Sequence, residues 1–534
     1  MKIGSLFVEK MKTQHDTAAL LWLGLVLLIA LSIAFLLPVT PQDYWWYLRI
    51  GHDTLASGIV PRLDTLTFTR TGTAVDYQSW GAAVLFWLVY HLGGLTVTVL
   101  LRGVFVAITY TLVWATARRA GAGRLGASLV LLAAVLTSSN NWSVRPQLLA
   151  YPLFALAIFI LYRWQHGEER FNTIPRKSTA GQAATKEHEE KKPKEIVSSS
   201  PLGNFEPLVL KNFFQKGQNA VYWLPLISLV WVNLHGSFVM LILLVGAALV
   251  FGRGDRRSLG LAFAGVLLAT LANPRGFGAW TYVFSSLTVP SSQLFSAEWL
   301  PPVNSGWQMN IFFIWLVGFP LLAALSPRKL DRLEWSWFLG FGLLALWGER
   351  YVIWFVLILV VLTAGLLTDW EKKYLGGSEQ TRPVFNLALG VIFMLLPLVF
   401  LPGLRSTWWK QAPPATENTP MAATTWLAAH PDLPGPLWSE IGFSSYLEFA
   451  LPQRPTWIDT RFEVFPVKQW QAYQAITDAR YDWENLLDAA GVNLLMVSPQ
   501  NQPQLLSVLE ISRGWYAIYR DDEAVIYRRG RGGE

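Results

Sequence analysis

Long apolar segments alternate with short polar ones through most of the chain, from residue 18 to residue 402. Eleven of these segments approach or exceed the roughly 20 apolar residues that an α-helix needs to cross a bilayer. The pattern therefore predicts an α-helical polytopic membrane protein with about 11 transmembrane helices. The predicted spans are residues 18–38, 99–116, 124–139, 146–164, 219–233, 237–251, 258–273, 308–325, 335–348, 351–368 and 384–402.

A further apolar segment, residues 79–94, is short for an ordinary span. Its sequence, SWGAAVLFWLVYHLGG, is apolar for about 14 residues, a length more typical of a helix that lies in the membrane interface. We therefore expect an interfacial helix at 79–94. The alternative is a crossing here, which would reverse the orientation of the segments that follow.

Lys and Arg residues gather in alternate loops between the predicted spans. If the N-terminus is cytoplasmic, the inner loops with their flanking residues hold 25 Lys and Arg, whereas the opposite side holds about seven before Gly403. Lys and Arg preferentially stay on the cytoplasmic side of a membrane. This asymmetry predicts a multi-pass protein of the plasma (inner) membrane, with its N-terminus in the cytoplasm and its C-terminal domain outside.

The composition agrees with a membrane protein and argues against a soluble protein, a nucleic-acid-binding protein and a protein with thiolate metal sites. Hydrophobic residues make up 52% of the 534 residues and charged residues only 15%, too few to cover a soluble protein of this size. The net charge of +7 comes from the loops, because the chain from Gly403 onward has 11 Lys and Arg against 15 Asp and Glu. We therefore expect no nucleic-acid partner. The absence of cysteine excludes disulfides and thiolate metal sites.

The pattern divides the chain into a transmembrane domain, residues 1–402, and an extracytoplasmic domain, residues 403–534. Within the first, residues 39–98 form the first outer loop with its interfacial helices. Residues 165–218 form a polar insert, predicted to be cytoplasmic and disordered because it has too few apolar residues to bury a core.

The C-terminal segment alternates helix-like and strand-like stretches. A predicted helix in WENLLDAAG is followed by the strand-like VNLLMVS, and WYAIYRDDEAVIYRR has the alternating pattern of a hairpin. Such alternation over about 130 residues is typical of a small α/β domain.

An acidic residue, Asp43, follows the first predicted span directly, in the sequence PQDYWWYLR. The Trp and Tyr residues after it are favoured at a membrane interface. A carboxylate at this place can act as a general base toward a hydroxyl or amine, or bind a divalent cation. We therefore take Asp43 as the candidate catalytic residue. The alternative is a structural cap for the helix that follows.

Three arginines, Arg145, Arg275 and Arg350, lie at predicted outer ends of spans. The guanidinium group offers a planar fork of donors that suits phosphate, so these residues are candidates for binding a phosphate group. The alternative is that each arginine extends to the interface or pairs with an acidic residue.

Four more polar residues fall on the same predicted face: Asp64, Asp76, His235 and Glu298. Ionisable groups near membrane depth are costly, and they usually pair or line a functional cavity. We expect them to contact an acceptor or to support the residues that do. Turn or cap roles are the alternative, above all for Asp64 and His235.

Several motifs together resemble the GT-C glycosyltransferases, in particular the branch with aminoarabinose transferases and protein mannosyltransferase-like enzymes, and an uncharacterised prokaryotic subgroup. The resemblance covers most of the chain and is carried by Asp43 after the first span and by GHDTLASGIVPRLDTLTFT, WLVYHLGG, LLRG, ATARR, NNWSVRPQLLAYPLF, WVNLHGSF, NPRGF and AEW. A weaker resemblance links WSEIGFSSYLEFALPQRPTWIDTR to the outer domain of oligosaccharyltransferases, with Trp438-Ser439-Glu440 in place of their WWD-type motif.

The resemblance implies that the protein transfers a sugar from a polyprenyl-phosphate carrier to an acceptor outside the membrane. Asp43 occupies the place of the catalytic acidic residue in the first outer loop, and the arginines would hold the donor phosphate. Gln42 and Tyr44 flank Asp43 where relatives often have an adjacent acidic pair, so the need for a divalent cation stays open. The implied partners are a polyprenyl-phosphate-linked sugar, membrane lipid and an acceptor glycan, lipid or protein.

Two other functions fit parts of the pattern. A transporter or flippase of lipid-linked sugars would place charged residues at mid-bilayer, whereas the predicted spans are nearly free of charge. A catalytically inactive scaffold with the same fold is compatible with the single acidic residue of the first loop.

Overall fold

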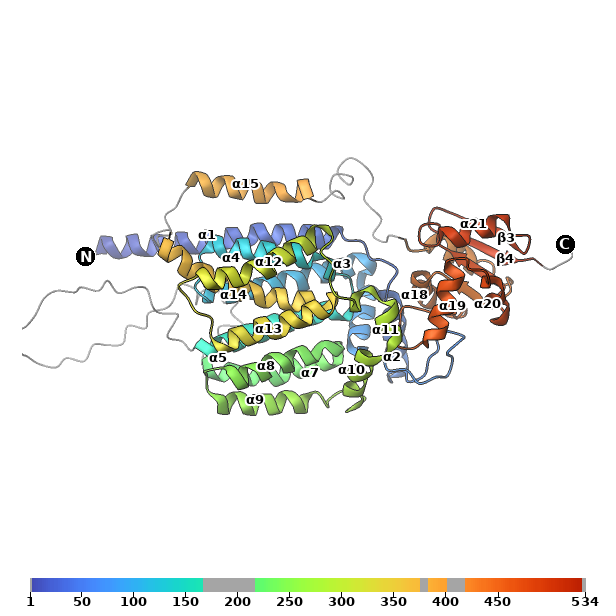
Figure 1. Ribbon diagram of the computed structural model, residues 1–534, viewed down its shortest axis with the longest axis horizontal. Helices are drawn as coiled ribbons and strands as arrows, with labels where there is room; N and C mark the ends of the chain where they lie inside the picture. Colours follow the sequence, from blue (N-terminus) through green and yellow to red (C-terminus); the bar gives the residue numbers. More distant parts are fainter. Residues whose placement is uncertain (1, 167–216, 375–382, 401–417, 531–534) are drawn as a thin grey trace, which may run out of the picture.

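The computed structural model describes residues 2–166, 217–374, 383–400 and 418–530. A bundle of helices forms one part of the molecule and a smaller α/β part, which contains the C-terminus, lies at one end of the bundle (Figure 1). Almost all of the predicted insert at 165–218, and the predicted domain boundary at residue 403, lie outside the described residues.

All 11 predicted spans fall on helices, because their runs of Leu, Val, Ala and Phe favour helix in an apolar environment. The helices of the bundle are α1 (Lys2–Leu36), α3 (Trp80–Arg119), α4 (Arg124–Ser138), α5 (Pro146–His166), α7 (Leu224–Leu234), α8 (Val239–Phe251), α9 (Arg256–Ala269), α12 (Gly306–Leu325), α13 (Arg332–Trp347), α14 (Val352–Tyr374) and α15 (Pro383–Phe400).

Five helices of the described residues are long and apolar enough to cross a membrane: residues 19–36, 80–119, 146–166, 306–325 and 349–368. Two shorter apolar helical segments cover residues 220–234 and 236–251. The protein is therefore a multi-pass membrane protein. The count of 11 crossings and the orientation of the chain stay predictions.

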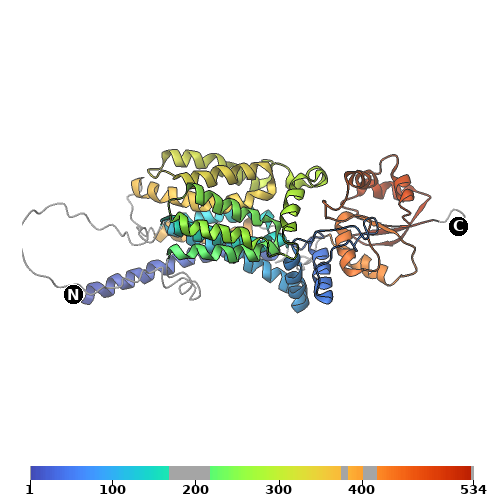
Figure 2. The ribbon, with the colours of Figure 1, turned by 90° about the horizontal axis from the view of Figure 1, so that it is seen from below.

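The segment 79–94 and the predicted span 99–116 form one helix, α3, with a break in the middle. The backbone leaves the helical conformation at Gly93 and Gly94, and Gly94 has φ 61°, which glycine adopts without steric cost. The part of α3 before the break packs on α2 (Tyr44–Ser57), where Phe86 lies against Tyr44 with ring centroids 5.8 Å apart. Helix α2 runs across the direction of the bundle, at the end that faces the α/β part (Figure 2).

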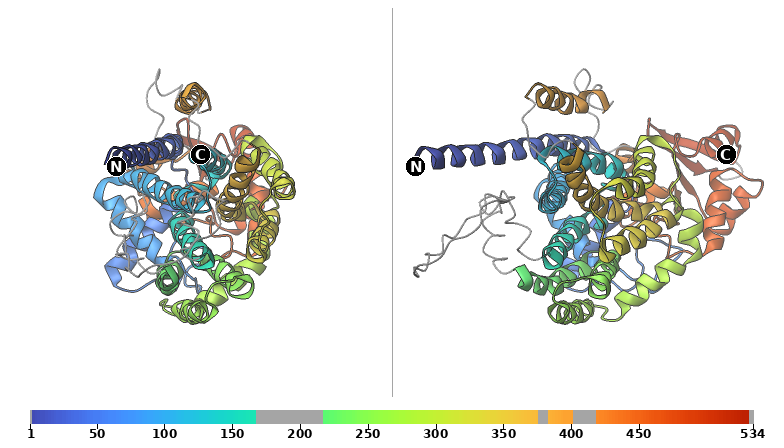
Figure 3. Two further views of the ribbon diagram at one scale, coloured as in Figure 1. Left: turned by 90° about the vertical axis from the view of Figure 1, so that its left-hand side faces the viewer. Right: turned by 60° about the vertical axis from the view of Figure 1, so that its left-hand side comes forward.

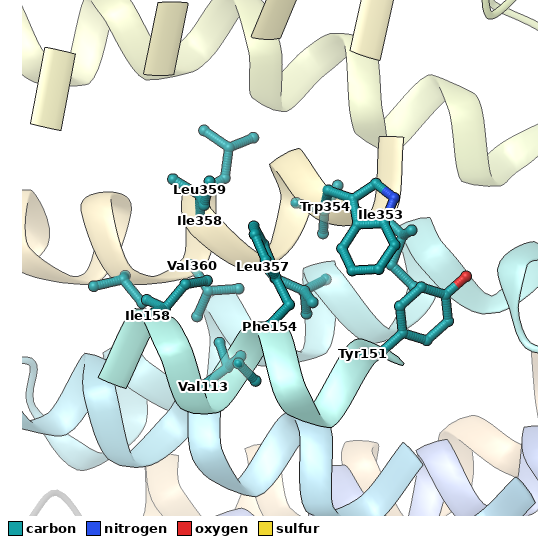
Figure 4. Packing of buried hydrophobic residues seen from close by; sticks show 14 of the residues in the cluster. Val113, Tyr151, Phe154, Ile158, Ile353, Trp354, Leu357, Ile358, Leu359 and Val360 are labelled. Atoms are coloured by element: carbon teal, nitrogen blue, oxygen red, sulfur yellow. The ribbon is translucent and has the colours of Figure 1, made fainter. Parts of the chain in front are cut away.

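Helix α14 lies at the centre of the bundle and is buried against protein along most of its length. Side chains of α5 pack on it, and Trp354 makes ring contacts of 5.1 Å with both Tyr151 and Phe154 (Figure 4). Helix α15 lies at the edge of the bundle, where Phe393 packs against Trp22 of α1 (Figure 3). The apolar core is thus concentrated around α5 and α14.

Shorter helices complete the bundle, and most of them lie at the end that faces the α/β part (Figure 1). They are α10 (Gly278–Thr288), α11 (Pro290–Phe295) and the 3-10 helices η1 (Ser139–Asn141), η4 (Gly217–Trp223), η5 (Gly236–Phe238), η6 (Ala297–Trp299) and η7 (Glu349–Tyr351). Most of these segments, together with α2, lie between the bundle and the α/β part (Figures 1 and 2).

The C-terminal part contains a small mixed sheet covered by helices. Strands β1 (Leu437–Ser439), β2 (Leu494–Val497), β3 (Trp515–Arg520) and β4 (Val525–Arg529) pair in the order β1-β2-β4-β3. Strands β1 and β2 are parallel, whereas β4 is antiparallel to β2 and β3. Helices α17 (Met421–Ala428), α18 (Ile441–Ala450), α19 (Val467–Thr477), α20 (Trp483–Ala489) and α21 (Pro503–Ile511) complete this part. The predicted hairpin at 515–529 is β3 and β4.

The first outer loop and the C-terminal part are joined by a buried polar group that we name the Arg461 cluster. Its members are Asp64 and Tyr77 from the loop, and Glu448, Asp459 and Arg461 from the C-terminal part. Nη1 of Arg461 lies 2.7 Å from Asp64 Oδ1 and donates a 2.8 Å hydrogen bond to the Tyr77 hydroxyl. Nε of Arg461 donates to Asp459 at 2.9 Å. Burial, together with the charge of Asp459, raises the pKa of Glu448 well above its usual range.

Candidate active site

A cavity of about 900 Å³ lies where the bundle meets the C-terminal part. The bundle contributes the segment before α2, the start of α5, the turn at η5, and the ends of α13 and η7. Helices α10 and α11 line one side, and residues 440–442 and 460–463 of the C-terminal part close another. Residues far apart in sequence therefore face a single space.

Asp43 lines this cavity immediately before α2. Its side chain makes no capping hydrogen bond to that helix, and Oδ2 instead lies 3.4 Å from Nε of Arg145. The C-terminal part fixes the segment, because the Ser445 hydroxyl donates to the Gln42 carbonyl and the Trp46 indole donates to Thr460 Oγ1 at 3.1 Å. Asp43 thus has a fixed backbone position and a carboxylate directed toward a cation.

Arg145 lies in the turn before α5 and pairs with two carboxylates, Asp43 and Glu298. Burial alone would raise the pKa of the Glu298 carboxyl, but Arg145 and Arg350 outweigh burial, so this pKa is below its usual range. Glu298 is therefore ionised at neutral pH. Arg145 is held between two negative charges.

Arg350 lies in η7, between α13 and α14, and its guanidinium stacks over the Trp299 ring at 4.3 Å from the ring centroid. No carboxylate of the described residues lies within 4.0 Å of it. Because Arg350 also lines the cavity, it presents a cation there that the protein's own carboxylates do not neutralise by direct contact. Such a group is suited to an anionic ligand.

His235 lies in the turn between α7 and η5, and its Nδ1 accepts a 3.0 Å hydrogen bond from the Ser237 backbone N–H. Burial, with the positive charges of Arg350 and Arg145, lowers the pKa of His235 to about 3. The imidazole is therefore neutral at physiological pH, and it offers hydrogen bonds rather than charge to the cavity.

Three residues predicted for the site lie elsewhere. Asp64 is fully buried in the Arg461 cluster, where it also accepts hydrogen bonds from Thr67. Asp76 and Arg275 form an ion pair with each other, and Arg275 also donates to the Val75 carbonyl. None of the three lines the cavity. The structure thus brings together Asp43, Arg145, His235, Glu298 and Arg350, and leaves Asp64, Asp76 and Arg275 outside.

Two cavity carboxyl groups were not predicted from the sequence. Glu440 caps α18 by accepting a 3.0 Å hydrogen bond from the Phe443 N–H, and burial raises its pKa to about 7. Glu463 accepts a 3.3 Å hydrogen bond from the Tyr282 hydroxyl. The WSEIGF motif drew attention to Glu440 as a replaced residue, whereas no motif marked Glu463.

The side chains around Asp43 do not form a set of metal ligands. Its nearest charged partner is a guanidinium, and within the described residues no group of three or more His, Cys, Asp or Glu side chains could hold a metal ion. Among the described residues, the surroundings of Asp43 therefore do not supply the set of ligands that a divalent cation needs.

No known protein-family model matches the chain, and no curated protein matches it in sequence. Solved structures do match. The oligosaccharyltransferase of Archaeoglobus fulgidus, tethered with an acceptor peptide, is 10% identical with a TM-score of 0.54 and covers 96% of this chain and 74% of its own. The same organism's AglB, in complex with an inhibitory peptide and a dolichol-phosphate, gives a TM-score of 0.53 at 10% identity and the same coverage.

ArnT from Cupriavidus metallidurans bound to undecaprenyl phosphate is 15% identical with a TM-score of 0.47, over 95% of this chain and 97% of ArnT. At this TM-score the likeness to ArnT adds nothing to the comparison with the archaeal enzyme. The archaeal structures match across nearly the whole chain, bundle and C-terminal part together. The chain therefore has the fold of the GT-C type glycosyltransferases.

Proposed function

We propose that this protein transfers a sugar from a polyprenyl-phosphate carrier to an acceptor on the outer face of the membrane. One observation carries the proposal: a single cavity presents an ion-paired carboxylate, Asp43, and an arginine, Arg350, that pairs with no carboxylate of the described residues. The shared fold supports it, since the archaeal oligosaccharyltransferase has been solved in complex with a dolichol-phosphate.

The donor would place its lipid chain along the apolar wall of the cavity and its phosphate at Arg350. Met240, Leu243, Trp280 and Trp347 belong to this wall. Arg350 suits the phosphate better than Arg145, because Arg145 already has Asp43 and Glu298 as partners.

Asp43 would act as the general base. It withdraws the proton from a hydroxyl or amine of the acceptor, and the oxygen or nitrogen of that group attacks the anomeric carbon of the sugar. The bond from this carbon to the phosphate oxygen breaks, and its electron pair leaves with the polyprenyl phosphate. Attack opposite the leaving group inverts the anomeric configuration. Because phosphate leaves readily, positioning and one base account for much of the required catalysis.

Two variants of the purified protein in lipid nanodiscs test this assignment, with a panel of polyprenyl-phosphate monosaccharides as donors. We expect Asp43→Asn to bind donor normally and to lower turnover by about 100-fold or more, the usual effect of losing a positioned base. We expect Arg350→Ala to weaken donor binding by about 10- to 100-fold, as for loss of a hydrogen bond to a charged group.

The result also separates this function from its alternatives. Full turnover in Asp43→Asn would make its carboxylate structural. Donor binding without transfer by the wild-type protein would favour a scaffold, and movement of donor across a bilayer without transfer would favour a flippase.

A further inference from the structure

Glu463 is held in the cavity wall by the contacts of the two residues before it, Arg461 and Phe462. Two residues before it, Arg461 is fixed in the Arg461 cluster. The Phe462 carbonyl accepts a 2.8 Å hydrogen bond from the Ser291 hydroxyl, and the Phe462 ring stacks on Trp470 with centroids 4.5 Å apart. Glu463 therefore presents its carboxyl group to the cavity from a rigid segment.

The two carboxyl groups Asp43 and Glu463 share the cavity but differ in their partners. Asp43 has the guanidinium of Arg145 3.4 Å away, so protonation of Asp43 would cost this ion pair. Glu463 accepts a hydrogen bond from Tyr282, and no Lys, Arg or His of the described part of the chain lies within 4.0 Å of it. Glu463 therefore lacks the direct cationic partner that Asp43 has.

Electrostatics of the cavity support the same division. The side chain of Glu463 is open to the cavity but enclosed by protein on its other sides, and this desolvation raises its pKa above the usual range. The charge of Asp43 adds to the increase, whereas that of Arg461 opposes it. Pairs of titrating groups whose environments separate their pKa values commonly divide acid and base roles.

We propose that Glu463 is a second catalytic carboxyl group, which holds the acceptor's proton at the end of the transfer step. This inference rests on the proposed function. Asp43 orients the nucleophile and withdraws its proton, the new bond to the anomeric carbon forms, and the electron pair of the broken bond leaves with the phosphate. The proton comes to rest on Glu463, so Asp43 returns to its ion pair with Arg145.

The groups that act on Glu463 come from several elements, and each affects its titration. They are Asp43 before α2, Tyr47 of α2, Tyr282 of α10, and Asp459 and Arg461 of the C-terminal part. Among these, Asp43→Asn removes a negative charge while it leaves the volume of the side chain unchanged. It should therefore lower the pKa of Glu463, because the ionised form of Glu463 no longer faces a like charge.

Infrared titration of the full-length protein in nanodiscs tests the coupling without substrate. Because Glu440 and Glu448 also have raised pKa values, we expect a protonated-carboxyl C=O band with several components. One component should be lost in Glu463→Gln and should disappear at lower pH in Asp43→Asn than in the wild type. The exposed carboxyl of Glu484 provides a matched control, since Glu484→Gln should leave the band unchanged. A band that is unchanged in Glu463→Gln, or a Glu463 component that titrates identically in Asp43→Asn, would overturn the pairing.

Turnover with the donor panel tests the catalytic role. Glu463 must be ionised to accept a proton, so turnover should rise with pH through its pKa. Glu463→Gln should lower turnover by about 10- to 100-fold and abolish this acid limb, with unchanged donor binding and melting temperature. Glu463→Asp keeps a carboxyl group, so it should restore part of the turnover and of its rise with pH. A purely structural role for Glu463 would not predict this recovery.

The outcomes separate the two proposals. Wild-type turnover and pH profile in Glu463→Gln would overturn the role of Glu463 while Asp43→Asn still tests the proposed function. Absence of transfer by the wild-type protein would overturn the proposed function and the catalytic role of Glu463 with it. The infrared result shows independently whether the two carboxyl groups are coupled.

Discussion

Two groups of charged residues lie near the junction of bundle and C-terminal part, and they are built in opposite ways. In the Arg461 cluster the guanidinium is 2% exposed and contacts Asp64, Asp459 and Tyr77. In the cavity, Arg145 is held by two carboxylates, while the guanidinium of Arg350 stacks on a Trp ring and pairs with no carboxylate of the described residues. In the first group the guanidinium is closed off from solvent and paired with carboxylates, whereas the second leaves a cation directed toward an open space.

Whether the charged groups are fully paired distinguishes a structural cluster from a ligand-binding site better than the residue types do. Asp and Arg occur in both groups, and in both they come from segments far apart in sequence. A buried ion pair without access for a ligand can only hold the structure together. An arginine at a cavity wall without a carboxylate partner can gain a partner when a phosphate binds.

The largest effect is expected where the closed group loses its cation. Arg461→Met keeps the approximate length of the side chain but leaves the buried carboxylates of Asp64 and Asp459 without the cation that pairs with both. Removal of one partner from a buried ion pair lowers the free energy of unfolding by about 3–5 kcal/mol. We therefore expect the C-terminal part to be less stable and its contact with the first outer loop to weaken. Thermal unfolding and limited proteolysis of the purified protein measure the change.

The matched control is Arg480→Met, because Arg480 pairs with Asp478 on the surface and both side chains are at least half exposed. Such a pair contributes about 0–1 kcal/mol. If Arg461→Met were no more destabilising than Arg480→Met, the Arg461 cluster would not stabilise the contact between the first outer loop and the C-terminal part, as we infer.

A smaller effect on stability is expected at Glu440. This residue tests the comparison from the other side, because its carboxyl is buried without an ion pair of the kind that Arg461 makes in the described part of the chain. Burial raises the pKa of Glu440 from 4.5 to about 7. The folded protein therefore binds this proton more tightly than the unfolded chain does. The stability that this carboxyl provides is fully present below pH 4.5 and is lost as the pH rises through about 7.

Glu440→Gln should remove this dependence, because its amide oxygen can still accept the hydrogen bond from Phe443 but does not ionise. The difference in unfolding free energy between variant and wild type should change by about 3 kcal/mol between pH 4.5 and pH 8, in favour of the variant at high pH. Unfolding curves at both pH values measure it, with Glu484→Gln as control. A difference that is constant with pH would show that Glu440 is well solvated.

The sequence predicts the helices and the small sheet well because both depend on local patterns. Runs of apolar residues identify the bundle helices, and alternation identifies the hairpin β3–β4. The sequence also predicts two helical segments, 79–94 and 99–116, and the backbone of α3 leaves the helical conformation between them, at Gly93 and Gly94. Whether the part before the break lies in the interface stays a prediction.

The candidate site is less accessible to sequence reasoning because its composition depends on tertiary contacts. Asp43, Arg145 and Arg350 were selected because they lie at the outer ends of predicted spans, and they face one cavity. Glu463 has no such signal, since it enters the cavity only through the fold of the C-terminal part. Arg275 has the same local appearance as Arg350, and only the position of Asp76, far away in sequence, distinguishes them.

The smallest effect is therefore expected from Arg275, the arginine predicted for the donor phosphate that lies outside the cavity. Its guanidinium pairs with Asp76, and the two side chains are 22% and 40% exposed, so the pair should contribute no more than about 1 kcal/mol. Arg275→Ala should leave donor affinity within about twofold of wild type, in contrast to Arg350→Ala. A double-mutant cycle with Asp76→Ala measures the coupling of the pair through the midpoint of thermal unfolding.

If Arg275→Ala instead weakened donor binding as strongly as Arg350→Ala, the donor phosphate would have to reach past the cavity wall. The distinction between paired and unpaired arginines would then fail as a guide to this site.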